Sequence, residues 1–397
     1  MKGSNRLGVL AESATLAMSK RVRELKAEGK DIIGLTLGEP DFDTPAHIRQ
    51  AAIQAVEESD THYPPVAGKP ALREAVATKY QRDFGIPYTP SNVMVSTGAK
   101  QSLVNVIMSL VNPGEEAIMV APYWVSYREM LKMAEAKLVT VQTSIENGFK
   151  LQPEDLEAAI TPNTKLILFN NPNNPTGATH TPEELAALAA VLERHPHVYM
   201  ISDEIYEHLT YGINTTSMAT FESIRDRVII INGVSKAFAM TGWRIGFTIA
   251  AEWLVKLCEK YQGQITSGAS TISQRAAIAA MTGSLEATES MRVEFEKRRN
   301  FLHESLSNIP GLKAYLPEGA FYFYPDLSGF IGCSAPDGTQ LDEIDAVCAY
   351  ILNASGLALI PGSAFGTDKH VRISYAYDMA SLEDAMQRLK SCLSELK

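Results

Sequence analysis

Residues 165–206 read KLILFNNPNNPTGATHTPEELAALAAVLERHPHVYMISDEIY, and their pattern indicates the class of fold. Lys165–Phe169 and Val198–Ile201 are short, mostly apolar runs, which is typical of buried strands. Between them, Thr181-Pro-Glu-Glu184 matches a capping box with proline at the first helical position, and it predicts a helix that continues to Leu192. A strand, a helix and a second strand in this order predict two parallel strands joined across a helix.

The same alternation continues on both sides of this unit. Strands are expected at Asn92–Ser96, Glu116–Val120 and Val228–Ile231, and a helix is expected at Gln101–Leu110. Repeated strand–helix units of this kind predict an α/β fold built around a largely parallel sheet.

The two ends of the chain carry elements that would build a second, smaller domain. A helix is expected at Leu16–Glu28, with Gly29 as its stop signal. Near the C-terminus, strands are expected at Leu357–Ile360 and His370–Ser374, and an amphipathic helix at Ser381–Leu396. From this order we expect an N-terminal arm with part of the small domain in residues 1–44, a large domain in 45–290, and the rest of the small domain in 291–397.

Composition argues against several kinds of partner. The 397 residues include 36 Lys or Arg and 46 Asp or Glu, so the formal net charge is −10. This charge repels the phosphates of nucleic acids and anionic membrane surfaces, so we expect neither as a partner. Met1–Leu10 lacks the apolar core of a signal peptide, no stretch approaches the roughly 18 apolar residues of a membrane span, and the four cysteines form no C-x-x-C pair. We therefore expect a cytoplasmic protein without a disulfide framework or a metal site.

Polar motifs follow five of the expected strands at the point where each strand ends. In open α/β sheets, ligands bind beyond the carboxyl ends of the strands, so these motifs are expected to converge on one site. In chain order they are Gly98-Ala99-Lys100, Tyr123-Trp124, Asn170-Asn171-Pro172-Asn173-Asn174-Pro175, Asp203-Glu204-Ile205-Tyr206 and Ser235-Lys236.

The residue types in these motifs suit an anion and a ring with a basic nitrogen. The backbone N–H groups of Gly98 to Lys100 would open a helix and form an anion site, although an ordinary strand-to-helix turn is the alternative. Asp203 could keep a pyridine nitrogen protonated, so that the ring acts as an electron sink, or it could be a helix cap or half of an ion pair. Tyr206 and Asn174 could donate to a ring phenolate, although Asn-Pro is also common turn chemistry.

Lys236 lies in the strongest local signal, SKAFAMTGWRIG at residues 235–246. Single lysines are mostly solvated at the surface. Apolar neighbours, however, favour a depressed pKa and therefore a nucleophilic amine. Arg244, eight residues later, could bind a phosphate with its fork of donors.

This segment resembles the S-K-x-x-x-M-T-G-W-R-x-G signature of the fold-type I, class I aminotransferases, and within them the bacterial aspartate aminotransferases. The resemblance covers nearly the whole chain, from Ser13-Ala14-Thr15 to His370-Val371-Arg372-Ile373-Ser374. It also includes Gly38-Glu39-Pro40-Asp41-Phe42, Tyr63-Pro64-Pro65, Pro122-Tyr123-Trp124-Val125-Ser126-Tyr127, Asn171-Pro172-Asn173-Asn174-Pro175-Thr176-Gly177 and Pro317-Glu318-Gly319-Ala320-Phe321-Tyr322. It implies a large domain with a mostly parallel seven-stranded sheet, a smaller α/β domain, and pyridoxal 5′-phosphate as the cofactor.

The resemblance implies a role for each residue that matches the family's cofactor site. Lys236 would carry the cofactor as a Schiff base and then act as general base and acid in a 1,3-proton shift. Asp203 would pair with the ring nitrogen, Trp124 would stack on the ring face, and Asn174 and Tyr206 would bond the ring oxygen.

The same resemblance implies how the phosphate is held. Its ligands would be the N–H groups of Ala99 and Lys100, which follow Gly98, together with Ser235 and Arg244. Tyr63 would reach the phosphate of the partner subunit's cofactor, so the enzyme would be a homodimer with shared active sites.

For the substrates, the resemblance implies amino acids and 2-oxo acids with two carboxylates. Arg372 would bind the α-carboxylate, helped by the backbone of Gly38 and by Trp124 and Asn174, which line the same position. Lys100 would bind the distal carboxylate, helped by Ser13 and Thr15. We therefore expect a ping-pong transfer from L-aspartate to 2-oxoglutarate. The alternatives are an aminotransferase with aromatic, prephenate or other specificity, and a Lys100 that only adds positive charge near the phosphate.

Three positions depart from the family pattern. Gly233 replaces the first serine of a frequent S-x-S-K motif, so one phosphate hydroxyl is expected to be missing. Ala11-Glu12 stands where relatives that also transaminate prephenate carry Lys-Pro, so we expect weak or absent prephenate activity. Arg275 stands where relatives often have a large apolar residue, and it would be either structural or in contact with a neighbouring subunit.

Other functional classes fit less well. A Cβ-lyase or synthase with the same cofactor is the nearest rival. A nicotinamide-dependent dehydrogenase would need G-x-G-x-x-G after a first strand, and this chain lacks that motif. A regulatory protein built on the same fold would need a DNA-binding domain, and only 37 residues precede Gly38.

Overall fold

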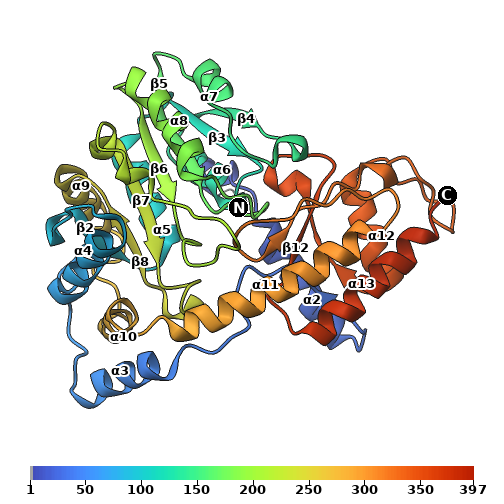
Figure 1. The fold of residues 1–397 in the computed structure, drawn as a ribbon, viewed down its shortest axis with the longest axis horizontal. Helices are drawn as coiled ribbons and strands as arrows, with labels where there is room; N and C mark the ends of the chain where they lie inside the picture. The colour runs from blue at the N-terminus through green and yellow to red at the C-terminus, as the bar shows by residue number, and fades with distance from the viewer. Residues whose placement is uncertain (1–2) are drawn as a thin grey trace.

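In the computed structural model, which describes residues 3–397, a seven-stranded sheet forms the centre of the larger part of the molecule (Figure 1). The strands lie in the order β2-β8-β7-β6-β5-β3-β4. β8 is antiparallel to both of its neighbours, and all other neighbouring pairs are parallel. The strands are β2 (Val93–Ser96), β3 (Glu116–Ala121), β4 (Lys137–Gln142), β5 (Thr164–Asn170), β6 (Tyr199–Asp203), β7 (Val228–Gly233) and β8 (Gly246–Ile249). The predicted α/β fold with a mostly parallel seven-stranded sheet is confirmed.

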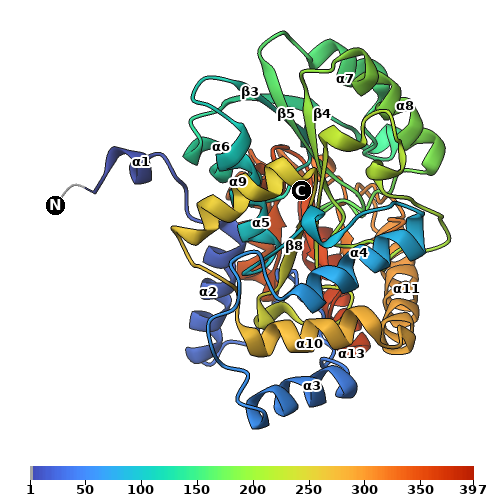
Figure 2. The same cartoon turned by 90° about the vertical axis from the view of Figure 1, so that its left-hand side faces the viewer.

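Helices cover both faces of this sheet because its strands are apolar on both sides. In β2, for example, Val93 and Val95 belong to one hydrophobic core and Met94 to the other, as the alternation of side chains along a strand requires. One face is covered by α5 (Ala99–Leu110), α6 (Val125–Met133) and α9 (Glu252–Gly263). The other is covered by α4 (Pro70–Phe84), α7 (Pro153–Ala159), α8 (Pro182–Arg194) and α10 (Thr271–Thr282), with α3 (Ala46–Glu57) packed on α10 (Figure 2).

The smaller part of the molecule has its own sheets and its own core. β9 (Tyr322–Phe323), β12 (Val371–Ser374) and β11 (Ile360–Pro361) form an antiparallel sheet, while β1 (Ile33–Gly34) pairs in parallel with β10 (Leu357–Ala358). The helices here are α2 (Ala14–Ala27), α12 (Ile344–Ser355) and α13 (Met379–Ser394). α11 (Glu286–Ser307) runs between the two parts (Figure 1). α1 (Asn5–Gly8) projects away from the rest of the chain (Figure 2).

Some element boundaries differ from the predictions for local reasons. α13 begins before the expected Ser381 because the carboxylate of Asp378 caps it, accepting the N–H of Ser381 at 2.9 Å. The expected strand at Leu357–Ile360 is divided between β10 and β11, which pair with different partners. β4 and β8 were not predicted. The capping box of α8 is present, with the N–H of Glu184 3.2 Å from Thr181 Oγ1. Among residues 3–397, no helix is long and apolar enough to cross a membrane.

Candidate active site

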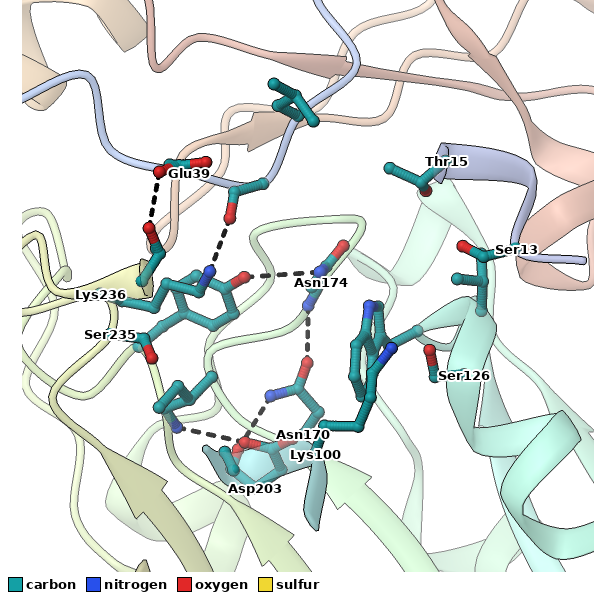
Figure 3. A pocket seen from close by; sticks show the side chains of 18 of the residues that line it. Ser13, Thr15, Glu39, Lys100, Ser126, Asn170, Asn174, Asp203, Ser235 and Lys236 are labelled. Carbon is teal, nitrogen blue, oxygen red and sulfur yellow. Dashed lines mark hydrogen bonds between the residues drawn. The ribbon is translucent and has the colours of Figure 1, made fainter. Parts of the chain in front are cut away.

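A cavity of about 330 Å³ lies between the strand ends of the large sheet and residues of the smaller part (Figure 3). The predicted site residues that line it are Ser13, Thr15, Gly38, Ala99, Lys100, Trp124, Asn174, Asp203, Tyr206, Ser235, Lys236, Arg244 and Arg372. Two predicted residues do not line it. Gly98 lies directly against Arg244, and Tyr63 lies elsewhere on the surface with its side chain 97% exposed. The expectation that polar strand ends converge on one site agrees with this arrangement.

Lys236 points into the cavity from the loop after β7 (Figure 3). Its Nζ donates to the carbonyl oxygen of Gly38 at 2.6 Å. Burial lowers the pKa of Lys236 to about 8, with the cations of Arg244 and Arg372 acting in the same direction and the carboxylates of Glu39 and Asp203 opposing them. An appreciable share of this amine is therefore unprotonated, and nucleophilic, near neutral pH.

Asp203 is the last residue of β6, and only 5% of it is exposed. Its Oδ2 accepts the hydroxyl of Tyr127 at 2.7 Å, and its Oδ1 accepts the N–H of Ile205 at 3.3 Å. Burial raises the pKa of Asp203 to about 6, although both hydrogen bonds and Lys236 work against this. A carboxyl group in this setting would be held ionised by a cationic group that binds beside it.

Arg372 is almost completely buried, with 1% of its surface exposed, in β12. One guanidinium nitrogen donates to Asn174 Oδ1 at 3.1 Å, and another donates to the carbonyl of Thr36 at 2.6 Å. Its Nε has no hydrogen-bond partner within residues 3–397. Buried polar groups are normally paired. A guanidinium that is held in place but lacks one hydrogen-bond partner is therefore suited to binding a carboxylate.

The start of α5 and the loop after β7 form a narrow cradle. Gly98 has φ +82°, and a Cβ on it would lie 2.4 Å from Arg244 Nη2. A Cβ on Gly246 would lie 2.1 Å from the backbone nitrogen of Ala99. These two glycines therefore let the first N–H groups of α5 and the guanidinium of Arg244 approach each other closely, with Ser235 buried next to them. A helix N-terminus beside an arginine suits a phosphate.

Most of the chain matches one known family. The profile described as "Aminotransferase class I and II" matches residues 30–389. The chain belongs to the class I and II aminotransferases. It is 45% identical over 380 residues to a probable aspartate/prephenate aminotransferase of Rhizobium leguminosarum bv. phaseoli, covering 95% of each chain. It is 43% identical to an aspartate aminotransferase of Geobacillus stearothermophilus, covering 98% of each. A crystal structure of the aspartate aminotransferase of Rhizobium meliloti superposes with a TM-score of 0.97 at 39% identity, covering 100% of both chains.

Aminotransferases of this type use pyridoxal 5′-phosphate, and the cavity fits that group. The cradle at Gly98 is open to a phosphate because a side chain there would fill it. Lys236 offers an amine with a depressed pKa, and Asp203 offers a buried carboxyl group for a ring nitrogen. Within the described part of the chain, no group of His, Cys, Asp and Glu is arranged to hold a metal ion.

The far wall of the aminotransferase cavity contains a second cation. Lys100 Nζ lies 4.9 Å from the ring centre of Trp124, and burial lowers its pKa, as does the positive charge of Arg244. Ser13 and Thr15 lie on the same side of the cavity (Figure 3). The hydroxyl oxygen of Thr15 is buried and has no partner in residues 3–397, which leaves it available to a ligand.

Three residues with important contacts stand in the quoted motifs but were given no role of their own from the sequence. Tyr127 holds Asp203, as described above. Asn170 donates to the backbone carbonyl of Asp203 at 2.8 Å and accepts the N–H of Asn174 at 2.7 Å, so it joins two neighbouring strand ends. Tyr322 bonds the hydroxyl of Tyr206 at 2.8 Å. Tyr127 and Tyr322 were signalled by the family motifs PYWVSY and PEGAFY, and Asn170 by its place directly after the expected strand Lys165–Phe169.

The structure explains two of the three departures from the family pattern. A Cβ on Gly233 would lie 2.8 Å from the carbonyl oxygen of Ile245, so this backbone leaves no room for a serine side chain. Arg275 bonds Glu58 at 2.9 Å and Asp60 at 3.4 Å, and it therefore braces the loop that precedes Tyr63.

Proposed function

We propose that this aminotransferase transfers the amino group of L-aspartate to 2-oxoglutarate by a ping-pong mechanism, which gives oxaloacetate and L-glutamate. The observation that carries this proposal is a cavity with two separate cationic walls. Arg372 supplies one, and Lys100 with Ser13 and Thr15 supplies the other. A substrate with two carboxylates requires both. The names of the relatives, aspartate or aspartate/prephenate aminotransferase, support the same substrate class.

Pyridoxal phosphate, when bound, supplies an electron sink that acidifies the Cα–H of the amino acid. Lys236 is the residue that would hold it covalently, and Asp203 would keep its ring nitrogen protonated. The cradle of Gly98, Ala99, Lys100, Ser235 and Arg244 would hold its phosphate, and Trp124 would cover its ring face.

Lys236 also has the properties of the general base and acid of the reaction. Its amine has a pKa of about 8, so it can accept the substrate's Cα proton and later return a proton near neutral pH. Meanwhile Arg372 would fix the α-carboxylate and thereby choose which Cα bond is broken. Asn174 and Tyr206 would donate to the ring oxygen, and Asn174 is held for this by Arg372 at 3.1 Å.

We also propose a cytoplasmic homodimer with shared active sites. Tyr63 is a large aromatic residue that is 97% exposed, yet its loop is braced by the ion pair of Asp60 with Lys69 at 2.7 Å and by Arg275. A rigidly presented, exposed tyrosine is suited to a partner subunit. Within each subunit, residues 45–290 would form the large domain, and residues 1–44 and 291–397 the arm and the small domain.

A mixture of two impaired variants would test the shared sites. We expect Tyr63→Ala and Lys236→Ala dimers, when unfolded together and refolded at equal amounts, to recover up to about a quarter of wild-type activity, because half of the dimers would be hybrids with one intact site each. Each variant refolded alone is the control. No recovery above the sum of the two controls, in a mixture shown to contain hybrids, would contradict the shared-site dimer.

The substrate proposal is tested by a spectrum and one variant. Adding L-aspartate to the cofactor-loaded protein should abolish its visible absorption band, and 2-oxoglutarate should restore it. In Lys100→Ala we expect kcat/KM for aspartate to fall about 100-fold, since a hydrogen bond between charged groups contributes about 2–3 kcal/mol. Activity with alanine should change less than about twofold.

Lys165→Ala is the matched control, because Lys165 also lies over an aromatic ring, that of Tyr199 at 5.0 Å, but outside the cavity. Equal losses with aspartate and alanine in Lys100→Ala would show instead that Lys100 acts on the cofactor phosphate.

Prephenate is the second acceptor to include. We propose weak or absent activity with it, because Ala11 and Glu12 bring no cation to the region before Ser13.

A further inference from the structure

Tyr322 lies where the proposed cofactor and substrate positions meet, yet the mechanism above gives it no role. It is fully buried in β9 and lines the cavity. Its hydroxyl lies 2.8 Å from the hydroxyl of Tyr206, and its ring lies 4.8 Å beneath the guanidinium carbon of Arg372. One side chain therefore contacts both the residue proposed for the ring oxygen and the residue proposed for the α-carboxylate.

The position of the Tyr322 hydroxyl is also fixed by the backbone of Gly38. A Cβ on Gly38 would lie 2.4 Å from this hydroxyl oxygen, so the contact is possible only because residue 38 is glycine. The carbonyl of Gly38 in turn accepts Lys236 Nζ at 2.6 Å. The Tyr322 ring is thus held against the Gly38 backbone, Tyr206 and Arg372, and it has little freedom to turn.

The number of protons on the two phenols determines which hydroxyl donates the hydrogen bond between them. A phenol has one proton to donate, and within residues 3–397 the hydroxyl of Tyr322 bonds only that of Tyr206. Tyr206 also accepts a long bond, 3.4 Å, from Asn174 Nδ2. If Tyr206 donates its proton to the cofactor's ring oxygen, the proton between the two phenols must come from Tyr322. That bond would polarise Tyr206 and make it a better donor.

We propose that Tyr322 is a positioning residue that directs and strengthens the hydrogen bond of Tyr206 to the cofactor's ring oxygen, while its ring supports Arg372. The inference rests on the proposed function, because it requires Tyr206 to face that oxygen. Its two parts use different atoms of the side chain. The hydroxyl acts through Tyr206, and the ring acts through a cation–π contact with Arg372.

Tyr322→Phe isolates the hydroxyl. A donor to the ring oxygen stabilises the more negative form of the bound cofactor, so a weaker donor should raise the pH at which the visible absorption changes. We expect this midpoint to rise by about half a pH unit in Tyr322→Phe, in keeping with the loss of one hydrogen bond, and by more in Tyr206→Phe. The KM for aspartate should stay within about twofold of wild type, because the ring beneath Arg372 remains.

Tyr322→Leu isolates the ring. It should show the same rise in the spectral midpoint, and in addition a KM for aspartate that is about tenfold higher, because Arg372 loses its aromatic support. Tyr324→Phe is the matched control, since Tyr324 is equally buried and its hydroxyl bonds Thr367 at 2.6 Å, outside the cavity. Thermal unfolding of the cofactor-free variants measures how much stability the fold loses with each hydroxyl. This loss should be similar in Tyr322→Phe and Tyr324→Phe.

The outcomes separate this inference from the proposed function. A midpoint that moves in Tyr206→Phe but not in Tyr322→Phe would overturn the role of Tyr322 alone. A midpoint that moves in neither would also overturn the placement of Tyr206 at the ring oxygen. An equal shift in Tyr324→Phe would show a general effect of losing a buried hydroxyl, and it too would overturn the inference.

Discussion

Replacing Lys236 with alanine is expected to lower kcat for amino-group transfer by about 10⁴-fold or more, because the variant loses both the covalent anchor of the cofactor and the group that moves the Cα proton. Among residues 3–397, no other lysine is placed to take over. Lys100, the second lysine that lines the cavity, lies over the ring of Trp124 and belongs to the opposite wall. The activity should be measured with excess pyridoxal phosphate, so that weaker cofactor binding does not limit it.

The covalent link between Lys236 and the cofactor can also be measured directly. Borohydride reduction of the loaded wild-type protein should add the cofactor mass to the peptide that contains Lys236, and the Lys236→Ala protein should gain none there. Lys260→Ala, at an exposed position in α9, should behave as wild type in both assays. Cofactor mass on a different lysine in the wild-type protein would refute the assignment of Lys236.

Replacing Arg372 with leucine is expected to lower kcat/KM for aspartate by about 10³-fold, because loss of a buried, charge-assisted partner costs about 4 kcal/mol. Arg372→Lys keeps the charge but loses the planar fork, and we expect an intermediate loss of about 100-fold. The guanidinium is already positioned by Asn174 and by the carbonyl of Thr36, so a shorter, single-headed ammonium cannot make both contacts and also bind a carboxylate.

The visible spectrum distinguishes this loss from misfolding. Both Arg372 variants should still bind pyridoxal phosphate and show its visible absorption band, while the aspartate concentration needed to abolish that band should rise steeply. A variant with normal affinity for aspartate but a low kcat would mean that Arg372 does not bind the α-carboxylate. Alanine provides a useful comparison, because it shares that carboxylate and should lose activity to a similar extent.

Much of the fold could be predicted from local pattern. The strands β3, β5, β6 and β7 and the helix α8 lie close to their predicted ranges, because apolar runs and a capping box are signals carried by neighbouring residues. β4 is an edge strand whose residues are mostly half-exposed or exposed, so it has no buried apolar run to reveal it. β8 has only four residues and follows a long irregular loop.

The residues of the candidate site also fall into those that could be predicted from the sequence and those that could not. Lys236 and Asp203 could be predicted because each follows a recognisable buried strand, and the rule for the carboxyl ends of strands then places them together. Tyr127 and Tyr322 could not be assigned contacts. They lie on a helix and on a two-residue strand, and their partners Asp203 and Tyr206 are 76 and 116 residues away.

Periodicity and turn chemistry over a few residues are enough to predict the α/β class, the strand–helix units and the reactive side chains at the strand ends. The strand order, in which β8 lies antiparallel between β2 and β7, is visible only in the folded chain. The same is true of the contact of Arg372 with Asn174 across 198 residues. Such contacts depend on how whole layers pack against each other, and no local pattern records which distant residues will meet.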